Sequence, residues 1–117
     1  MTSFGLDQRE IREPAARHVA LVGELDLTNA GELEAALVDA SADGVPLALD
    51  LSAITFVDSA ALHVLFRTSR RLGQNGFGLV VPPASPIART FEIVGLRRLV
   101  PVRPKLDELL EALTTWS

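Results

Sequence analysis

From residue 17 onward, short apolar segments alternate with longer amphipathic ones, and this alternation restricts the possible folds more than any other feature of the sequence. Residues 17–25 (RHVALVGEL), 46–52 (PLALDLS) and 77–81 (FGLVV) have the length and apolar content of buried strands. After each of them, apolar residues recur every three or four positions, as on one face of a helix. Strands that alternate with helices in this way predict a sheet with parallel neighbours, covered by helices.

Weaker patterns complete the series at both ends of the chain. Residues 4–11 (FGLDQREI) alternate weakly and predict a first strand at an edge of the sheet, and residues 98–102 (RLVPV) predict a last short strand. Helices are expected over residues 26–40, 59–72, 85–95 and 105–116. The expected order is ββαβαβαβα, an α/β fold with a mixed, mostly parallel sheet of four to five strands and about four helices.

The first and third helices also carry start and stop signals. Asn29 followed by Glu32 has the spacing of a capping box. Ser85, followed directly by proline, is the expected N-cap of the third helix, and Gly95 is its expected end. Residues 52–59 (SAITFVDS), which follow the strand over residues 46–52, are expected to be a loop and turn.

Composition limits the domain count and the function classes. A chain of 117 residues fits one compact domain, so residues 1–117 are treated as a single domain. Cysteine is absent, which excludes disulfides and Cys-based zinc sites and is typical of a cytoplasmic protein. A formal net charge of −4 disfavours direct contact with nucleic acid. The N-terminal residues are too charged for a signal peptide, and no apolar run could span a bilayer, so no direct membrane contact is expected.

Asp58 and Ser59 stand where an apolar segment stops and the helix over residues 59–72 begins. The simpler interpretation is a helix cap, because both side chains accept hydrogen bonds from free N–H groups. The functional interpretation is a modification site: a serine in a first helical turn is exposed, and the helix N-terminus tolerates a phosphate. Asp26, which follows the strand over residues 17–25, should lie at the same edge of the sheet. A phosphate on Ser59 would then make this region strongly negative and repel a docked partner.

The outward face of the helix over residues 59–72 is a second candidate feature. Helical spacing places Ala60, His63, Arg67 and Arg70 on it. Ala60 is small and allows close approach of another backbone, while the two arginines offer a basic rim to an acidic partner. The alternative interpretation is an ordinary solvated helix face.

Catalytic and metal sites have little support in the sequence. Asp58, Ser59 and His63 suggest a hydrolase, because Ser59 and His63 are one helical turn apart and could meet. However, no Gly-x-Ser-x-Gly elbow is present and no oxyanion hole can be assigned. His18 and His63 are far apart and no cysteine accompanies them, so no metal site is expected. The sequence also lacks a phosphate-binding loop motif. We therefore expect neither an enzyme nor a bound cofactor.

Two stretches of the chain resemble the STAS domain of bacterial anti-sigma factor antagonists. They are VGELDLTNAGELEAAL, residues 22–37, and ALDLSAITFVDSAALHVLFRTSRRL, residues 48–72. Gly-Glu-Leu-Asp before an Ala-rich helix is one specific feature, and Asp-Leu-Ser followed five residues later by Asp-Ser is another. With the order of elements, the resemblance covers nearly the whole chain and implies a STAS-like fold.

The resemblance also implies a function. Such antagonists bind an anti-sigma factor that is itself an ATP-dependent serine kinase, and binding releases a sigma factor. The kinase phosphorylates the antagonist on a hydroxyl at the start of the second helix, and a separate phosphatase reverses this. The matching phosphorylation site is Ser59. The residues expected to contact the partner are Asp26, Asp58, Ser59, Ala60, His63 and Arg67. The protein is expected to be a monomer or a weak dimer.

One short segment departs from the family pattern. The common form is Asp-Ser-Ser/Thr-Gly-Leu-Gly, whereas residues 58–63 read DSAALH. Some members are modified at the second hydroxyl, where Ala60 stands here, and others at the first, which is Ser59. Ala61 in place of glycine favours the helix. These changes also favour an alternative function. The protein would be an accessory subunit of a membrane lipid transport complex, with the same helix face bound permanently to the ATPase. A non-switching scaffold of a stress-signalling assembly is a third possibility.

Overall fold

A single five-stranded sheet organises the chain. The computed structural model describes residues 4–12 and 15–114, and the order of its strands is β1-β2-β3-β4-β5. Their bounds are β1 Phe4–Arg12, β2 Ala15–Leu25, β3 Leu47–Val57, β4 Phe77–Val80 and β5 Val102–Arg103. β1 is antiparallel to β2, and every later pair is parallel. The predicted mixed, mostly parallel α/β sheet is confirmed.

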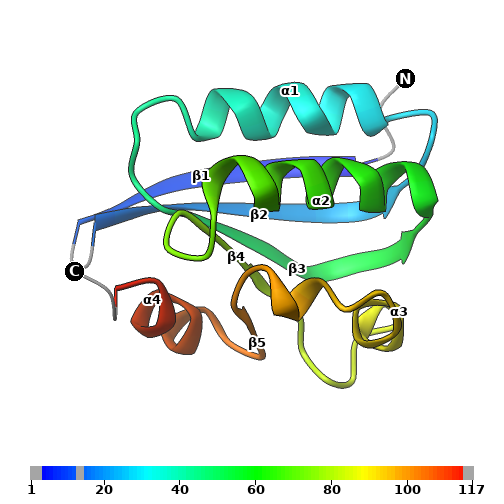
Figure 1. The fold of residues 1–117 in the computed structure, drawn as a ribbon. Helices are drawn as coiled ribbons and strands as arrows, with labels where there is room; N and C mark the ends of the chain where they lie inside the picture. The colour runs from blue at the N-terminus through cyan, green and yellow to red at the C-terminus, as the bar shows by residue number, and fades with distance from the viewer. Residues whose placement is uncertain (1–3, 13–14, 115–117) are drawn as a thin grey trace.

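Helices cover both faces of this sheet (Figure 1). They are α1 Ala30–Ala40, α2 Ser59–Leu72, α3 Ala88–Val94 and α4 Leu106–Thr114, with a 3-10 helix, η1 Leu96–Arg98. The predicted order of elements is confirmed. The helices α1, α2 and α3 contribute to one apolar cluster, whereas α4 contributes to another with β3 and β4. Since neighbouring residues of a strand point to opposite faces, these two clusters lie on opposite sides of the sheet.

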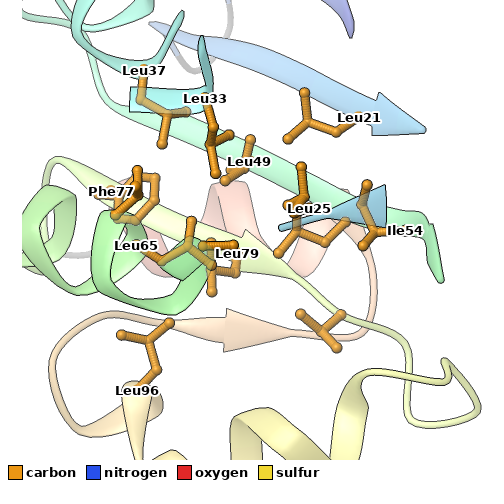
Figure 2. Close-up of a cluster of buried hydrophobic side chains, with 14 of the residues drawn as sticks. Leu21, Leu25, Leu33, Leu37, Leu49, Ile54, Leu65, Phe77, Leu79 and Leu96 are labelled. Carbon is orange, nitrogen blue, oxygen red and sulfur yellow. The ribbon is translucent and has the colours of Figure 1, made fainter. Parts of the chain in front are cut away.

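The larger cluster holds most of the buried apolar side chains (Figure 2). Leu33 and Leu37 of α1 and Leu65 of α2 pack over strand residues such as Leu21 and Leu49, and all five are at most 1% exposed. Leu33 and Leu37 are four residues apart on α1, a spacing that places both on one face of the helix. Their burial fixes α1 and α2 side by side on the sheet, and thereby positions the start of each helix.

A glycine allows α4 to approach the opposite face. Gly78 lies on β4 between Phe77 and Leu79 and is buried. A Cβ at this position would come within 2.5 Å of a methyl carbon of Leu109 and 3.1 Å of the carbonyl oxygen of Pro101. Leu109 is fully buried as a result. The absence of a side chain at Gly78 therefore determines how closely α4 packs on β4.

The structure corrects one predicted loop. Residues 52–57, expected to form a loop with the following turn, continue β3 instead. This half of β3 pairs with the end of β2, from Val22 against Ala53 to Leu25 against Val57. One register shift comes just before this stretch, between Ala20 and Val22, and a second lies within it, between Gly23 and Glu24. The shifts disturb the simple alternation of apolar and polar residues, which explains why the sequence pattern did not predict a strand here.

Other boundaries also differ from the prediction. α3 begins at Ala88 and not near Ser85, whose hydroxyl accepts a hydrogen bond from the N–H of Ile87 at 3.2 Å; Gly95 does end α3, in the left-handed conformation with φ 71°. The last strand is only two residues long, Val102–Arg103. Of the predicted segment 98–102, Arg98 is the end of η1 and residues 99–101 lie between η1 and the strand. The predicted end of the last helix, residues 115–116, lies outside the described residues. Within the described part of the chain, no helix is long and apolar enough to cross a bilayer.

Candidate functional site

Two loops meet at the carboxyl end of β2 and β3, where the sequence placed the candidate site. The N–H of Asp58 donates to the carbonyl oxygen of Leu25 at 3.1 Å. The N–H of Leu27 donates to Oδ2 of Asp58 at 2.9 Å. The turn after β2 and the start of α2 are thus joined by two hydrogen bonds, although they are far apart in the sequence. The prediction that these two loops share one edge of the sheet is confirmed.

Asp58 also caps α2. Its backbone is extended, with φ −107° and ψ −176°, and its Oδ1 accepts the N–H of Ala61 at 3.1 Å. This is the usual N-cap geometry, in which a side-chain oxygen accepts a hydrogen bond from the first helical turn. The predicted cap is confirmed. One carboxylate therefore binds two backbone segments, with one oxygen on the helix and the other on the loop after β2.

The loop after β2 is held by its own side chains. Asp26 accepts hydrogen bonds from the N–H and the hydroxyl of Thr28. Asn29 accepts the N–H of Asp26 at 2.9 Å and donates to the carbonyl oxygen of Glu24 at 2.9 Å. The side chain of Asn29 is 0% exposed and makes no hydrogen bond that caps α1. The part of the capping-box prediction that assigned this side chain to α1 is therefore wrong, because the loop takes both of its polar groups.

The serine and the outward face of α2 lie where the sequence predicted them. Ser59 is the first residue of α2 and is exposed, and Ala60 beside it is partly buried. His63, Arg67 and the nearby Arg70 are exposed on the outer side of the helix. Among the residues that the structure describes, no hydrogen bond joins Ser59 to His63, so the contact that a hydrolase would need is not formed.

Arg67 has a partner within the protein. Its guanidinium donates from Nε and an Nη atom to the two carboxylate oxygens of Glu34 on α1, at 2.9 and 3.0 Å. The hydrogen bond to Arg67 is the main reason that the pKa of Glu34 lies below its usual value, and the same contact raises the pKa of Arg67. The pair links α1 to α2 at the surface. Arg67, one of the two arginines of the predicted basic rim, is therefore paired with an acid of the same protein.

Sequence reasoning missed two exposed apolar side chains close to the site. Leu27, in the loop after β2, is 76% exposed, and its backbone is bound to Asp58. Phe56, near the end of β3, is 47% exposed. An apolar residue between Asp26 and Thr28, in an otherwise polar turn, was the available signal for Leu27. Phe56 was expected to lie in a loop, where an exposed side chain does not indicate a binding surface.

The other histidine, His18, is buried in the sheet beside an aspartate. His18 on β2 is 6% exposed, and its Nε2 lies 3.2 Å from Oδ2 of Asp50 on β3. Asp50 also accepts the N–H of Ser52 at 3.0 Å. Across the described ranges, 4–12 and 15–114, no group of three or more His, Asp or Glu side chains could hold a metal ion.

Known proteins resemble this chain over most of its length. A family model described as STAS domain matches residues 10–109. The anti-sigma-F factor antagonist RsfB of Mycobacterium tuberculosis is 37% identical over 79 residues, which is 67% of this chain and 65% of that protein. The alignment thus spans less than two thirds of the relative's length.

Solved structures extend the likeness. An anti-sigma factor antagonist from Mycobacterium paratuberculosis is 34% identical, with a TM-score of 0.82 over 95% of this chain and 94% of that one. The Bacillus cell fate determinant SpoIIAA in its phosphorylated form is 21% identical, with a TM-score of 0.58 over 92% of this chain and 96% of that one. At that identity the likeness is one of fold alone.

Proposed function

The chain belongs to the STAS domain family, and on this basis we propose that it is an anti-sigma factor antagonist switched off by phosphorylation of Ser59. The unphosphorylated protein, acting as one domain in the cytoplasm, binds an anti-sigma factor that is also a serine kinase, and a sigma factor is released. The kinase then modifies the antagonist, which dissociates, and a phosphatase restores it. The protein itself performs no catalytic step in this cycle.

The exposed hydroxyl of Ser59 is the observation that carries the proposal. Ser59 is the first residue of α2, and its predecessor Asp58 already supplies the cap. The hydroxyl of Ser59 is therefore not required to hold the helix, and a kinase can reach it. The free N–H groups and the dipole of a helix N-terminus also favour a phosphate at this position. The absence of a second hydroxyl at Ala60 leaves Ser59 as the acceptor.

The proposed contact surface combines apolar and polar groups around this serine. We call it the partner face; it consists of Asp26, Leu27, Asp58, Ser59, Ala60, His63 and Arg67. Leu27 is its exposed apolar residue, at 76%. Complete burial of a leucine side chain is worth about 1.5–3 kcal/mol, so a partner that covers Leu27 gains substantial free energy. Ala60 allows the partner's backbone to come close to α2.

A phosphate on Ser59 acts on this face through charge. It adds roughly −1.5 to −2 elementary charges beside the carboxylate of Asp58. A partner that buries the face would have to desolvate both groups, which is costly without new cations to pair with them. Because the hydrogen bonds of Asp58 and Asn29 hold the surrounding loops, release of the partner requires no rearrangement of the fold.

The direct test is the intact mass of the protein after incubation with ATP and kinase-type anti-sigma factors from the same genome. We expect the wild-type protein to gain one phosphate and Ser59→Ala to gain none. Ser52→Ala is the matched control, because Ser52 is an exposed serine on β3 outside the partner face, and it should be phosphorylated like the wild type. Binding measured in parallel should be lost on phosphorylation and persist in Ser59→Ala.

Two other results would redirect the proposal. Stable binding without phosphate transfer would leave an antagonist that is not switched at Ser59. If none of the anti-sigma factors binds, the proposal fails as a whole. Co-purification with the ATPase of a lipid transporter, or elution as part of a large particle, would then identify the accessory-subunit or the scaffold role.

A further inference from the structure

The first strand leaves one side of the sheet open. β1 is nine residues long, from Phe4 to Arg12, and among residues 4–12 and 15–114 it pairs with β2 alone. All of its residues except Phe4 and Ile11 are exposed. Its outer side, called the β1 edge below, therefore presents backbone N–H and C=O groups that are able to pair with another strand.

The usual devices that prevent such pairing are absent from this strand. Natural edges are often very short, interrupted by proline, or bent by a bulge. β1 contains no proline, and its register with β2 runs without a shift from Phe4 against Gly23 to Arg12 against Ala15. The charged side chains of β1 are then the remaining protection against pairing. Their arrangement decides which strand is repelled and which is accepted.

The charges of β1 are complementary to those of a second, antiparallel copy. Side chains directly opposite each other on antiparallel strands lie on the same face of the sheet. With Gln8 opposite Gln8 of the second copy, Asp7 falls opposite Arg9, and the same contact occurs twice because of the two-fold symmetry. Opposite charges in such cross-strand positions are favourable. Across β2, Asp7 faces Ala20 and Arg9 faces His18, so the neighbouring strand supplies Asp7 with no cation.

From this complementarity we infer that the protein forms a symmetric dimer through the β1 edge, with its two-fold axis at Gln8. The two five-stranded sheets then join into one continuous sheet. Ser59 and the rest of the partner face belong to other elements, so dimerisation is independent of the proposed phosphorylation, and either can fail without the other.

The symmetry leaves few other registers. A two-fold axis perpendicular to the sheet must place some residue opposite itself. An axis at Asp7, Arg9 or Glu10 would put two like charges directly opposite each other, which is unfavourable. An axis at Leu6 would pair only residues 4–8. The axis at Gln8 pairs all nine residues of β1 and brings opposite charges together.

A single cysteine tests both the interface and the register. The natural sequence has no cysteine, so Gln8→Cys introduces one thiol per chain. Residues directly opposite on antiparallel strands have Cα atoms about 4.5–5.5 Å apart, which suits a disulfide. We expect Gln8→Cys to form a covalent dimer under mild oxidation, seen on a non-reducing gel. The register is wrong if the variant does not cross-link.

Leu6→Cys is the matched control, because Leu6 lies on the same strand and the same face. In the inferred dimer the two Leu6 residues are four positions out of register, roughly 14 Å apart. This variant should remain uncross-linked, whereas the double variant Leu6→Cys/Glu10→Cys should cross-link because Leu6 faces Glu10. Equal cross-linking of Gln8→Cys and Leu6→Cys would indicate random collisions and overturn the inference.

Charge exchange provides a second test in solution. Sedimentation velocity should show the wild type as a dimer whose fraction rises with concentration, and Asp7→Arg and Arg9→Asp should each dissociate roughly tenfold or more readily. A mixture of these two variants should dimerise again, because each then faces the opposite charge. Glu92→Arg and Arg89→Asp on α3, away from β1 (Figure 1), are controls that should behave like the wild type. A monomeric wild type at all concentrations would refute the dimer.

Discussion

At the junction of β2 and α1, the side chain of Asn29 is buried and binds the backbone of its own loop, at Asp26 and Glu24. At the junction of β3 and α2, the side chain of Asp58 lies near the surface and binds the helix and the other loop. Both residues precede a helix at the same edge of one sheet. The first junction is closed and structural, whereas the second leaves Ser59 exposed beside its cap. Under the proposed function, two adjacent positions of the fold are divided between stability and regulation.

The largest expected effect is on the closed junction. Asn29→Ala leaves the N–H of Asp26 and the carbonyl oxygen of Glu24 without the buried amide that pairs with them. Loss of buried hydrogen-bond partners costs about 1–3 kcal/mol per unsatisfied group, so unfolding by urea should show a loss of about 2 kcal/mol or more. Asn29→Asp keeps the acceptor oxygen but turns a buried carboxylate oxygen toward the carbonyl oxygen of Glu24, so it should not restore the lost stability. Equal stability of Asn29→Ala and wild type would contradict the structural role of this side chain.

A smaller effect is expected at the open junction. Asp58→Ala removes the cap of α2, a change that typically costs about 1 kcal/mol, and frees the N–H of Leu27. In urea unfolding, Asp58→Asn should lose less stability than Asp58→Ala, because its amide oxygen can still cap α2, while its NH2 group cannot accept the N–H of Leu27. Amide hydrogen exchange at Leu27 should accelerate in the alanine variant. If the two variants were equally destabilised, the cap on Ala61 would contribute little, and the second oxygen or the charge of Asp58 would hold the junction.

Ser59→Ala should leave stability within about 0.5 kcal/mol of the wild type, because exposed substitutions away from special features have small effects. The alanine retains helix propensity, and the cap is supplied by Asp58. Thermal unfolding followed by circular dichroism measures this. A large loss of stability would mean that the hydroxyl of Ser59 also holds the helix, and the contrast between a structural and a regulatory junction would weaken.

The smallest effect concerns the surface pair that joins the two helices behind these junctions. Arg67 holds the pKa of Glu34 below its usual value through a hydrogen bond. The stabilisation by this pair is therefore fully present above the pKa of Glu34 in the unfolded chain and is lost as pH falls through its lower pKa in the folded protein. On acidification, the melting temperature of Glu34→Gln should fall slightly less than that of the wild type. Identical pH profiles would show that solvent screens the pair completely.

The sequence predicted the elements that depend on local patterns. The bounds of α2 agree with the expected residues 59–72, because its apolar positions repeat regularly and Asp58 is a strong N-cap. The second half of β3 was missed, because its register shifts against β2 break the alternation that identifies a strand. Register depends on how two strands pair, so it cannot be predicted from the residue pattern of either strand alone.

The candidate site shows the same division. Asp58 and Ser59 could be located from the sequence, since capping is a local property. The contact between Arg67 and Glu34 could not, because it requires α1 and α2 to lie side by side on the sheet. Asn29 was recognised as a polar residue at a helix start, but its burial and its preference for the loop follow from tertiary packing.

The shared carboxylate of Asp58 has a practical consequence for spectroscopy. The amide protons of Leu27 and Ala61 both bind this side chain, one through each oxygen. Amide chemical shifts are sensitive to the charge and position of the acceptor, so the two resonances should move together whenever the surroundings of Asp58 change. Two signals from distant parts of the sequence would then form a built-in reporter, readable in a single titration without any attached label.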